Sequence, residues 1–206
     1  RSNNFNPSVG CCPGGGDTQS GPGSAEDDDG HGTSVSGILT SNGSVASMGV
    51  APASGIVALK VLDESGGGSF SDVASALDWI MTNYEAFNIR VVNMSLGDGD
   101  EYSSSATNPC SGSNTANAIA DLTAAGVAVF AASGNDAYTD GISFPACVAD
   151  AISVGGVYDA SLGNVSWCGE TCSTTLCTDS STAADDFVCH TNSDELLDLL
   201  APDYAT

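Results

Sequence analysis

The chain has 206 residues, of which 41% are apolar, so it is long enough for one domain with a substantial core and is not a disordered tail. Three basic residues stand against 26 acidic ones, and the net charge of −23 repels phosphate backbones, which excludes nucleic acid as a partner. A membrane span is excluded as well, because no apolar run approaches the roughly 20 residues that it needs.

Apolar runs and helical patterns alternate along the chain. GIVALKVL (55–62) is predicted to be a buried strand, and SFSDVASALDWIMTNY (69–84) an amphipathic helix with Ser69 as its start signal. The next predicted strand is IRVVNMSL (89–96), followed by the helix NTANAIADLTAAG (114–126), which stops at its glycine.

Three more strands are predicted, over VAVFAAS (127–133), AISVGGV (151–157) and, as a short strand entering a loop, ELLDLLAP (195–202). Unbroken apolar strands alternating with helices predict an α/β fold, a mostly parallel sheet with helices on both faces. Ligands of such sheets bind beyond the carboxyl ends of the strands, which singles out NMSLG (93–97) and ASGND (132–136).

Eight cysteines indicate disulfide bonds, because their number is even and no pair of C-x-x-C knuckles offers zinc a site. Residues 167–190 hold four of them, and we interpret this stretch as a cysteine-rich insertion whose cysteines pair among themselves. His190 is predicted to be a surface residue rather than a metal ligand. Disulfides predict a secreted, extracellular protein; the alternatives are a zinc site or reduced thiols buried as small apolar residues.

A disulfide between Cys110 and Cys147 is expected in addition. Cys110 precedes the helix at 114–126, and Cys147 follows the ASGND loop. Because the helix and the next strand run antiparallel, the chain can return both cysteines to the same end of the sheet. Cys11 and Cys12 are adjacent, so a bond between them would be strained.

His31 is one of only two histidines and lies in DDDGHGTSVSGIL (27–39). One interpretation is merely a capped helix start, with Val35, Ile38 and Leu39 packed inward. The glycines at positions 32 and 37 indicate that this segment has a role beyond forming a helix, because each glycine costs a helix up to about 1 kcal/mol relative to alanine.

Six segments resemble, in the same order, those of the subtilisin-like serine peptidases. They are HGTSVSGIL with His31, VALKVLDESGGGSFSDVASALDWI, NMSLG, AGVAVFAASGND, SFPACVADAISVGGV and LLDLLAP, and they cover roughly residues 26 to 202. The resemblance implies a subtilisin-like fold and a secreted, monomeric serine endopeptidase that hydrolyses extended peptide or protein substrates by acyl-enzyme chemistry.

The resemblance also implies roles for single residues. His31 matches the general base, and Asn135 matches the side chain that donates to the developing oxyanion. Ser95, Leu96 and Gly97 match the backbone edge that pairs with substrate, and Ala132, Ser133 and Gly134 match the other wall of the specificity pocket. The alternatives are a turn residue at position 135 and a strand that simply ends at the glycine of NMSLG.

The aspartate and serine of a triad are not recognisable. No strand precedes Asp17-Thr18-Gln19, and Ser34 stands three residues from His31 with no separate oxyanion donors. We therefore expect residues 1–206 to be part of a single subtilisin-like peptidase domain, truncated at both ends, with both missing residues outside the chain and the fragment itself inactive.

Two other functions remain open, an inactive subtilase-like peptide-binding module and a structural calcium-binding domain without a peptide site. No cofactor is expected for the chemistry. Structural calcium is expected from the resemblance and from aspartates in loops, although no ligand set can be assigned. Those aspartates are Asp27, Asp28, Asp29, Asp98, Asp100, Asp136 and Asp140.

Overall fold

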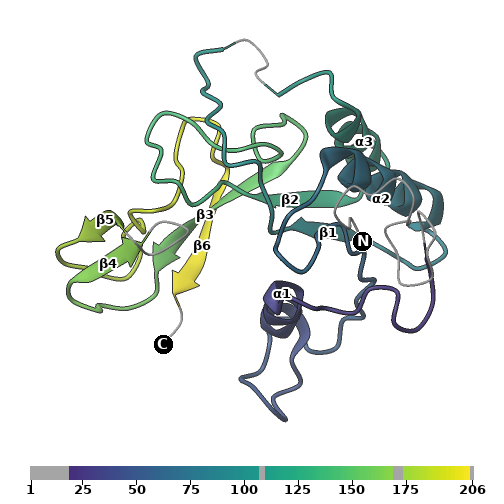
Figure 1. The fold of residues 1–206 in the computed structure, drawn as a ribbon, viewed down its shortest axis with the longest axis horizontal. Coiled ribbons are helices and arrows are strands. Elements are labelled where there is room, and N and C mark those ends of the chain that lie inside the picture. The colour runs from purple at the N-terminus through teal and green to yellow at the C-terminus, as the bar shows by residue number, and fades with distance from the viewer. Residues whose placement is uncertain (1–18, 107–109, 169–173, 205–206) are drawn as a thin grey trace. The chain divides into compact units, whose positions relative to one another are not determined.

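The computed structural model describes residues 19–106, 110–168 and 174–204 (Figure 1). The chain forms two compact units, Arg1–Asp78 and Trp79–Thr206. The first contains helix α1 (His31–Thr40), and the boundary falls inside helix α2 (Phe70–Asn83). Across the described ranges, no helix is both long and apolar enough to cross a membrane.

Helix α2 forms where the periodic pattern predicts a helix. Its buried apolar side chains Val73, Leu77 and Ile80 recur at helical spacing. The Ser69 side chain accepts a hydrogen bond from Ser71 N at 3.2 Å, just before the first turn. The predicted start signal therefore acts as a local cap.

The second unit is built on a four-stranded parallel sheet in the order β1-β2-β3-β6. Its strands are β1 (Val91–Met94), β2 (Ala128–Ala132), β3 (Ile152–Tyr158) and β6 (Leu199–Tyr204). Helix α3 (Asn114–Ala124) connects β1 to β2 and packs on β2 with its buried Ile119 and Leu122. The predicted α/β class and these four strands are confirmed.

The predicted strand over residues 55–62 is wrong. Only Leu62 forms an isolated bridge, to Gly68, and Ile56 and Val57 are exposed. A strand exists only where a neighbouring strand completes its ladder of hydrogen bonds. No strand in the described part of the chain pairs with this segment, so its apolar sequence alone does not make it one.

The cysteine-rich insertion contains a second, antiparallel sheet of β4 (Val165–Cys168) and β5 (Thr175–Asp179). Cys177 on β5 forms a disulfide with Cys189, which is a pairing within the insertion as expected. Cys168 is disulfide-bonded too. The expectations for Cys11, Cys12 and Cys172 lie outside the described residues.

The structure contains the expected disulfide between Cys110 and Cys147, with Cα atoms 5.8 Å apart. Both cysteines are buried. The bridge therefore ties the chain before α3 to the segment between β2 and β3.

Replacing both Cys110 and Cys147 by alanine should lower the free energy of unfolding by about 3–4 kcal/mol, because the bond closes a loop across 37 positions of sequence. Chemical denaturation would measure it. The matched control is the Cys177→Ala/Cys189→Ala pair, whose bridge spans only 12 positions and should cost about 1 kcal/mol less. In non-reducing peptide mapping, a Cys110 peptide alkylated without prior reduction would contradict the pairing.

Candidate functional site

His31 is the first residue of helix α1, and a carboxylate just upstream fixes this helix end. Asp27 accepts hydrogen bonds from Gly30 N at 3.0 Å, Thr33 N at 2.7 Å and the Thr33 hydroxyl. Asp29 accepts from His31 N at 3.2 Å. The imidazole is thus carried by a helix start at which two aspartates accept from the backbone N–H groups of Gly30, His31 and Thr33.

The Asp27 carboxyl is adapted to this capping role. The Thr33 hydroxyl and then the backbone N–H groups of Gly30 and Thr33 hold its pKa well below the usual range. A group with a lowered pKa stabilises the fold above its ordinary pKa and loses that effect as the pH falls through the lowered value. The cap of α1 therefore stays charged across the neutral and mildly acidic range.

The acidic triplet before His31 lies in a loop in which Asp28 and Asp29 are exposed, and two of its carboxylates also have definite partners. Asp27 caps α1, and Asp28 forms an ion pair with Lys60. Within the residues that the structure describes, no three His, Cys, Asp or Glu side chains gather as a metal site needs. The expectation of structural calcium, from the family resemblance and the loop aspartates, stays a prediction.

The alternative view of residues 31–39 as only a packed helix start is wrong for its apolar side. Helix α1 has no buried residue. Ile38 is 68% exposed and Leu39 is also exposed. Apolar packing within the described structure therefore does not explain why these residues come after His31.

The carboxyl ends of β1 and β2 bring the two predicted walls together. Met94 and Ala131 are register partners, and Ser95–Gly97 and Ala132–Gly134 continue the two strands. Ser143 lies against both continuations. A Cβ atom built on Gly97 would lie 3.5 Å from the Ser143 Cβ, and one built on Gly134 would lie 2.6 Å from the Ser143 Oγ.

Asn135 comes next, in the loop after β2. Its side chain is exposed and makes no hydrogen bond to any other described residue. By contrast, the backbone on both sides is fixed, because Gly134 O and Asp136 N are both hydrogen-bonded to Asn192. A free amide on a fixed backbone is what a hydrogen-bond donor to a developing charge requires. Sequence reasoning missed Asn192, whose surroundings HTNS (190–193) show no helical or strand period.

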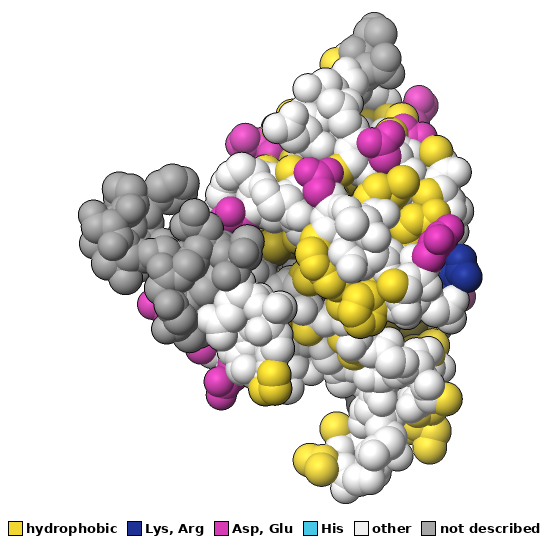
Figure 2. Space-filling model, turned by 90° about the vertical axis from the view of Figure 1, so that its right-hand side faces the viewer, with side chains coloured by type: hydrophobic (Ala, Val, Ile, Leu, Met, Phe, Trp, Pro, Cys, Tyr) yellow, Lys and Arg dark blue, Asp and Glu magenta, His cyan; other side chains and the backbone are white. Residues whose placement is uncertain are grey.

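This edge of the sheet is negatively charged. Burial, together with the hydrogen bond to Asp98, raises the pKa of Tyr102 to about 12. Burial also raises the pKa of Tyr138, with further contributions from Asp136 and Glu101. Both phenols therefore stay neutral beside the carboxylates. Figure 2 shows that acidic side chains are spread over the visible face, as the net charge of −23 leads one to expect.

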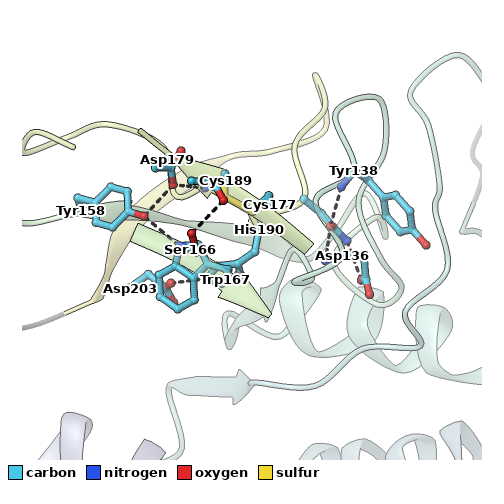
Figure 3. Close-up of a disulfide and its surroundings, with 12 residues drawn as sticks. Asp136, Tyr138, Tyr158, Ser166, Trp167, Cys177, Asp179, Cys189, His190 and Asp203 are labelled. Atoms are coloured by element: carbon cyan, nitrogen blue, oxygen red, sulfur yellow. Dashed lines mark hydrogen bonds and ion pairs between the residues drawn. A yellow bond between two sulfur atoms is a disulfide. The ribbon is translucent and has the colours of Figure 1, made fainter. Parts of the chain in front are cut away.

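His190 is not the surface residue that the sequence predicted. It is buried and lies against the ring of Trp167, with ring centroids 4.3 Å apart. Its Nε2 lies 2.9 Å from Asp203 Oδ2. Figure 3 shows this group beside the Cys177–Cys189 disulfide. The prediction failed because Trp167 and Asp203 come from β4 and β6, which the local sequence does not place.

Comparison with known proteins matches the chain to the Subtilase family over residues 14–201. It is 38% identical over 133 residues to Subtilisin Savinase of Lederbergia lenta, covering 64% of this chain and 44% of that protein. It is 39% identical over 131 residues to Alkaline elastase YaB of Bacillus sp. (strain YaB), covering 63% of this chain and 30% of that protein. The chain thus spans less than half the length of these relatives.

Solved structures agree with the sequence match. The crystal structure of a cold adapted subtilisin-like serine proteinase shares 30% sequence identity and superposes with a TM-score of 0.57, covering 86% of this chain and 50% of that chain. Sphericase superposes with a TM-score of 0.58 at 29% identity, covering 69% and 46%. The parallel sheet, the ordered motifs and the family match agree, and the chain belongs to the subtilase family.

Proposed function

We propose that the protein containing these residues is a secreted serine endopeptidase that cleaves extended peptides through an acyl-enzyme. One observation carries the proposal. The continuations of β1 and β2 lie together around Ser143, and the exposed side chain of Asn135 comes directly after the second of them. A backbone edge beside an amide donor suits peptide hydrolysis better than a structural calcium-binding domain without a peptide site.

In this proposal His31 is the general base. It accepts the proton of a serine hydroxyl as that oxygen attacks the scissile carbonyl, and it returns the proton to the leaving amine. The Asn135 amide donates to the oxyanion of the tetrahedral intermediate. Ser95–Gly97 hold the substrate by main-chain hydrogen bonds. The attacking serine and the aspartate that orients His31 are not assigned to residues of this chain.

The disulfides support an extracellular location, because such bonds persist in oxidising compartments. A monomer suffices, since one catalytic domain needs no partner copy for this chemistry. Structural calcium belongs to the proposal through the family resemblance and the loop aspartates.

Labelling the whole protein with a serine-directed fluorophosphonate tests the proposal. We expect labelling that disappears in His31→Ala, and no labelling of the 206-residue chain alone. The competing function is an inactive peptide-binding module. It would be favoured by a folded whole protein that binds extended peptides yet neither reacts with the probe nor cleaves any of them.

The residue before the scissile bond should be apolar or aromatic. The walls proposed for its pocket, Ser95–Gly97 and Ala132–Gly134, carry no charge that could pair with Lys or Arg. The acidic edge would attract basic substrates at low salt, so a peptide library should be profiled at about 1 M salt, where the screening length is about 3 Å. Cleavage mainly after Lys or Arg under these conditions would contradict the assignment of the walls.

A further inference from the structure

One buried residue, through its backbone and its side chain, holds the backbone on both sides of Asn135. Asn192 is 0% exposed and belongs to residues 189–193, which we call the support segment. Its backbone N donates to Gly134 O at 2.9 Å. Its side-chain Oδ1 accepts from Asp136 N at 2.8 Å and from Tyr138 N at 3.1 Å.

The chemistry of these partners fixes the orientation of the Asn192 amide. The oxygen faces two backbone donors, while Nδ2 donates to Asp136 Oδ2 at 3.2 Å and to Ser143 Oγ at 3.1 Å. Every polar atom of the buried side chain is therefore satisfied by the loop or its neighbour. A residue with fewer or differently placed polar atoms would leave loop groups unpaired.

The loop approaches Asn192 as closely as a glycine allows. Gly134 has φ +110°, and a Cβ atom there would lie 2.2 Å from the Asn192 Nδ2. Two further backbone hydrogen bonds join the support segment to the loop, from Ala137 N to His190 O at 2.9 Å and from Ser193 N to Tyr138 O at 2.9 Å. The loop and the support segment therefore form one hydrogen-bonded unit.

The support segment is itself anchored at its start. Cys189 is joined to β5 by its disulfide with Cys177, and its backbone N donates to Asp179 Oδ2 at 3.0 Å. His190 is held by Asp203 of β6 and by the Trp167 ring. These contacts tie the support segment to three strands, β4, β5 and β6.

A further anchor lies on the central sheet. The Thr191 hydroxyl accepts from Gly156 N of β3 at 3.0 Å, and it points to the sheet instead of the loop. Asn192 therefore reaches the loop from a backbone that is already fixed by the residues before it.

We propose that Asn192 is a positioning residue, which holds residues 134–138 so that the Asn135 amide is preorganised for the oxyanion. The proposal rests on the function proposed for Asn135. A donor that is fixed before the reaction costs no reorganisation when charge develops, whereas a displacement of about 1 Å can cost about 100-fold in rate. Asn192 acts through Asn135 and does not itself touch the substrate.

Steady-state kinetics of the whole protein test this. Asn192→Ala should lower kcat by about 10- to 100-fold with KM nearly unchanged, because the loss falls on the transition state. In an Asn135→Ala background, the same change should lower kcat by less than about threefold, because the donor that Asn192 positions is gone. Thr182→Val is the matched control, because the buried Thr182 hydroxyl accepts from Leu162 N at 2.6 Å and belongs to neither the loop nor the support segment. It should keep wild-type kcat in either background.

An equal loss of kcat with and without Asn135 would overturn the proposal, as would an unchanged kcat in Asn192→Ala. If Asn192→Ala does not fold, Ser143→Ala removes one hydrogen bond of the same amide. It should give a smaller loss of kcat that also vanishes in the Asn135→Ala background, and a loss that persists there would count against the proposal.

Hydrogen exchange separates this proposal from the one it rests on. Amide exchange of Asp136 and Tyr138 should accelerate in Asn192→Ala and stay unchanged in Thr182→Val. Unchanged exchange in Asn192→Ala overturns the positioning role whatever the kinetics show. If Asn135→Ala alone keeps the wild-type kcat, the oxyanion role of Asn135 is wrong, and the exchange result still decides whether Asn192 holds the loop.

Discussion

Replacing His31 by alanine in the whole protein should lower kcat by roughly four to six orders of magnitude. A serine hydroxyl is a weak nucleophile at neutral pH and needs a positioned base to take its proton. His31 suits that role because Asp27 and Asp29 hold the start of α1 by backbone hydrogen bonds that the substitution leaves in place. The protein should therefore fold normally, and active-site titration with peptide turnover would measure the loss.

The matched control is Ser34→Ala on the same exposed helix. Among the described residues, the Ser34 hydroxyl donates only to Gly30 O, at 3.0 Å, so its loss should leave kcat near the wild-type value. This control also tests whether Ser34 is the nucleophile, since that alternative predicts a loss as large as that of His31→Ala. A near-normal rate in His31→Ala would remove this histidine from the mechanism.

The elements that could be predicted from sequence are those defined by their own periodicity. Helix α2 and strand β2 are examples, because an apolar face or run marks each one regardless of its neighbours. Residues 55–62 have an equally apolar run, but a strand also needs a partner in its ladder, and local sequence does not report one. The prediction failed there because no neighbouring strand pairs with the segment in the described structure, although its apolar pattern was identified correctly.

The residues of the candidate site likewise fall into those that the sequence predicted and those that it did not. His31 and Asn135 were located through short motifs whose order along the chain is distinctive. Asn192 carries no such signal, because its importance comes from hydrogen bonds to residues more than 50 positions away. His190 was misjudged for a related reason, since its burial depends on Trp167 and Asp203. For both residues, the surroundings in the fold depend on contacts with residues far away in the sequence.

Asn135→Ala should lower kcat by roughly 100- to 1,000-fold while KM changes little. This magnitude was measured on a subtilisin and is carried over, not calculated for this chain. The physical reason is that the amide donates to an oxygen that becomes negatively charged only in the transition state, so its loss spares ground-state binding. The variant should also keep its thermal stability, because the side chain is exposed and makes no hydrogen bond to any other described residue.

Two further variants test whether the loss of kcat comes from the amide donor of Asn135. Asn135→Asp keeps the shape of the side chain but replaces the donor by a carboxylate, so at neutral pH it should lose at least as much kcat as alanine does. Tyr138→Phe, the control in the same loop, removes only the hydroxyl that donates to Gly99 O at 3.0 Å and should keep the wild-type kcat. A raised KM with unchanged kcat in Asn135→Ala would mean that Asn135 shapes the binding pocket and does not stabilise the oxyanion. The reason is that kcat falls only when the lost interaction is made in the transition state and not in the bound substrate.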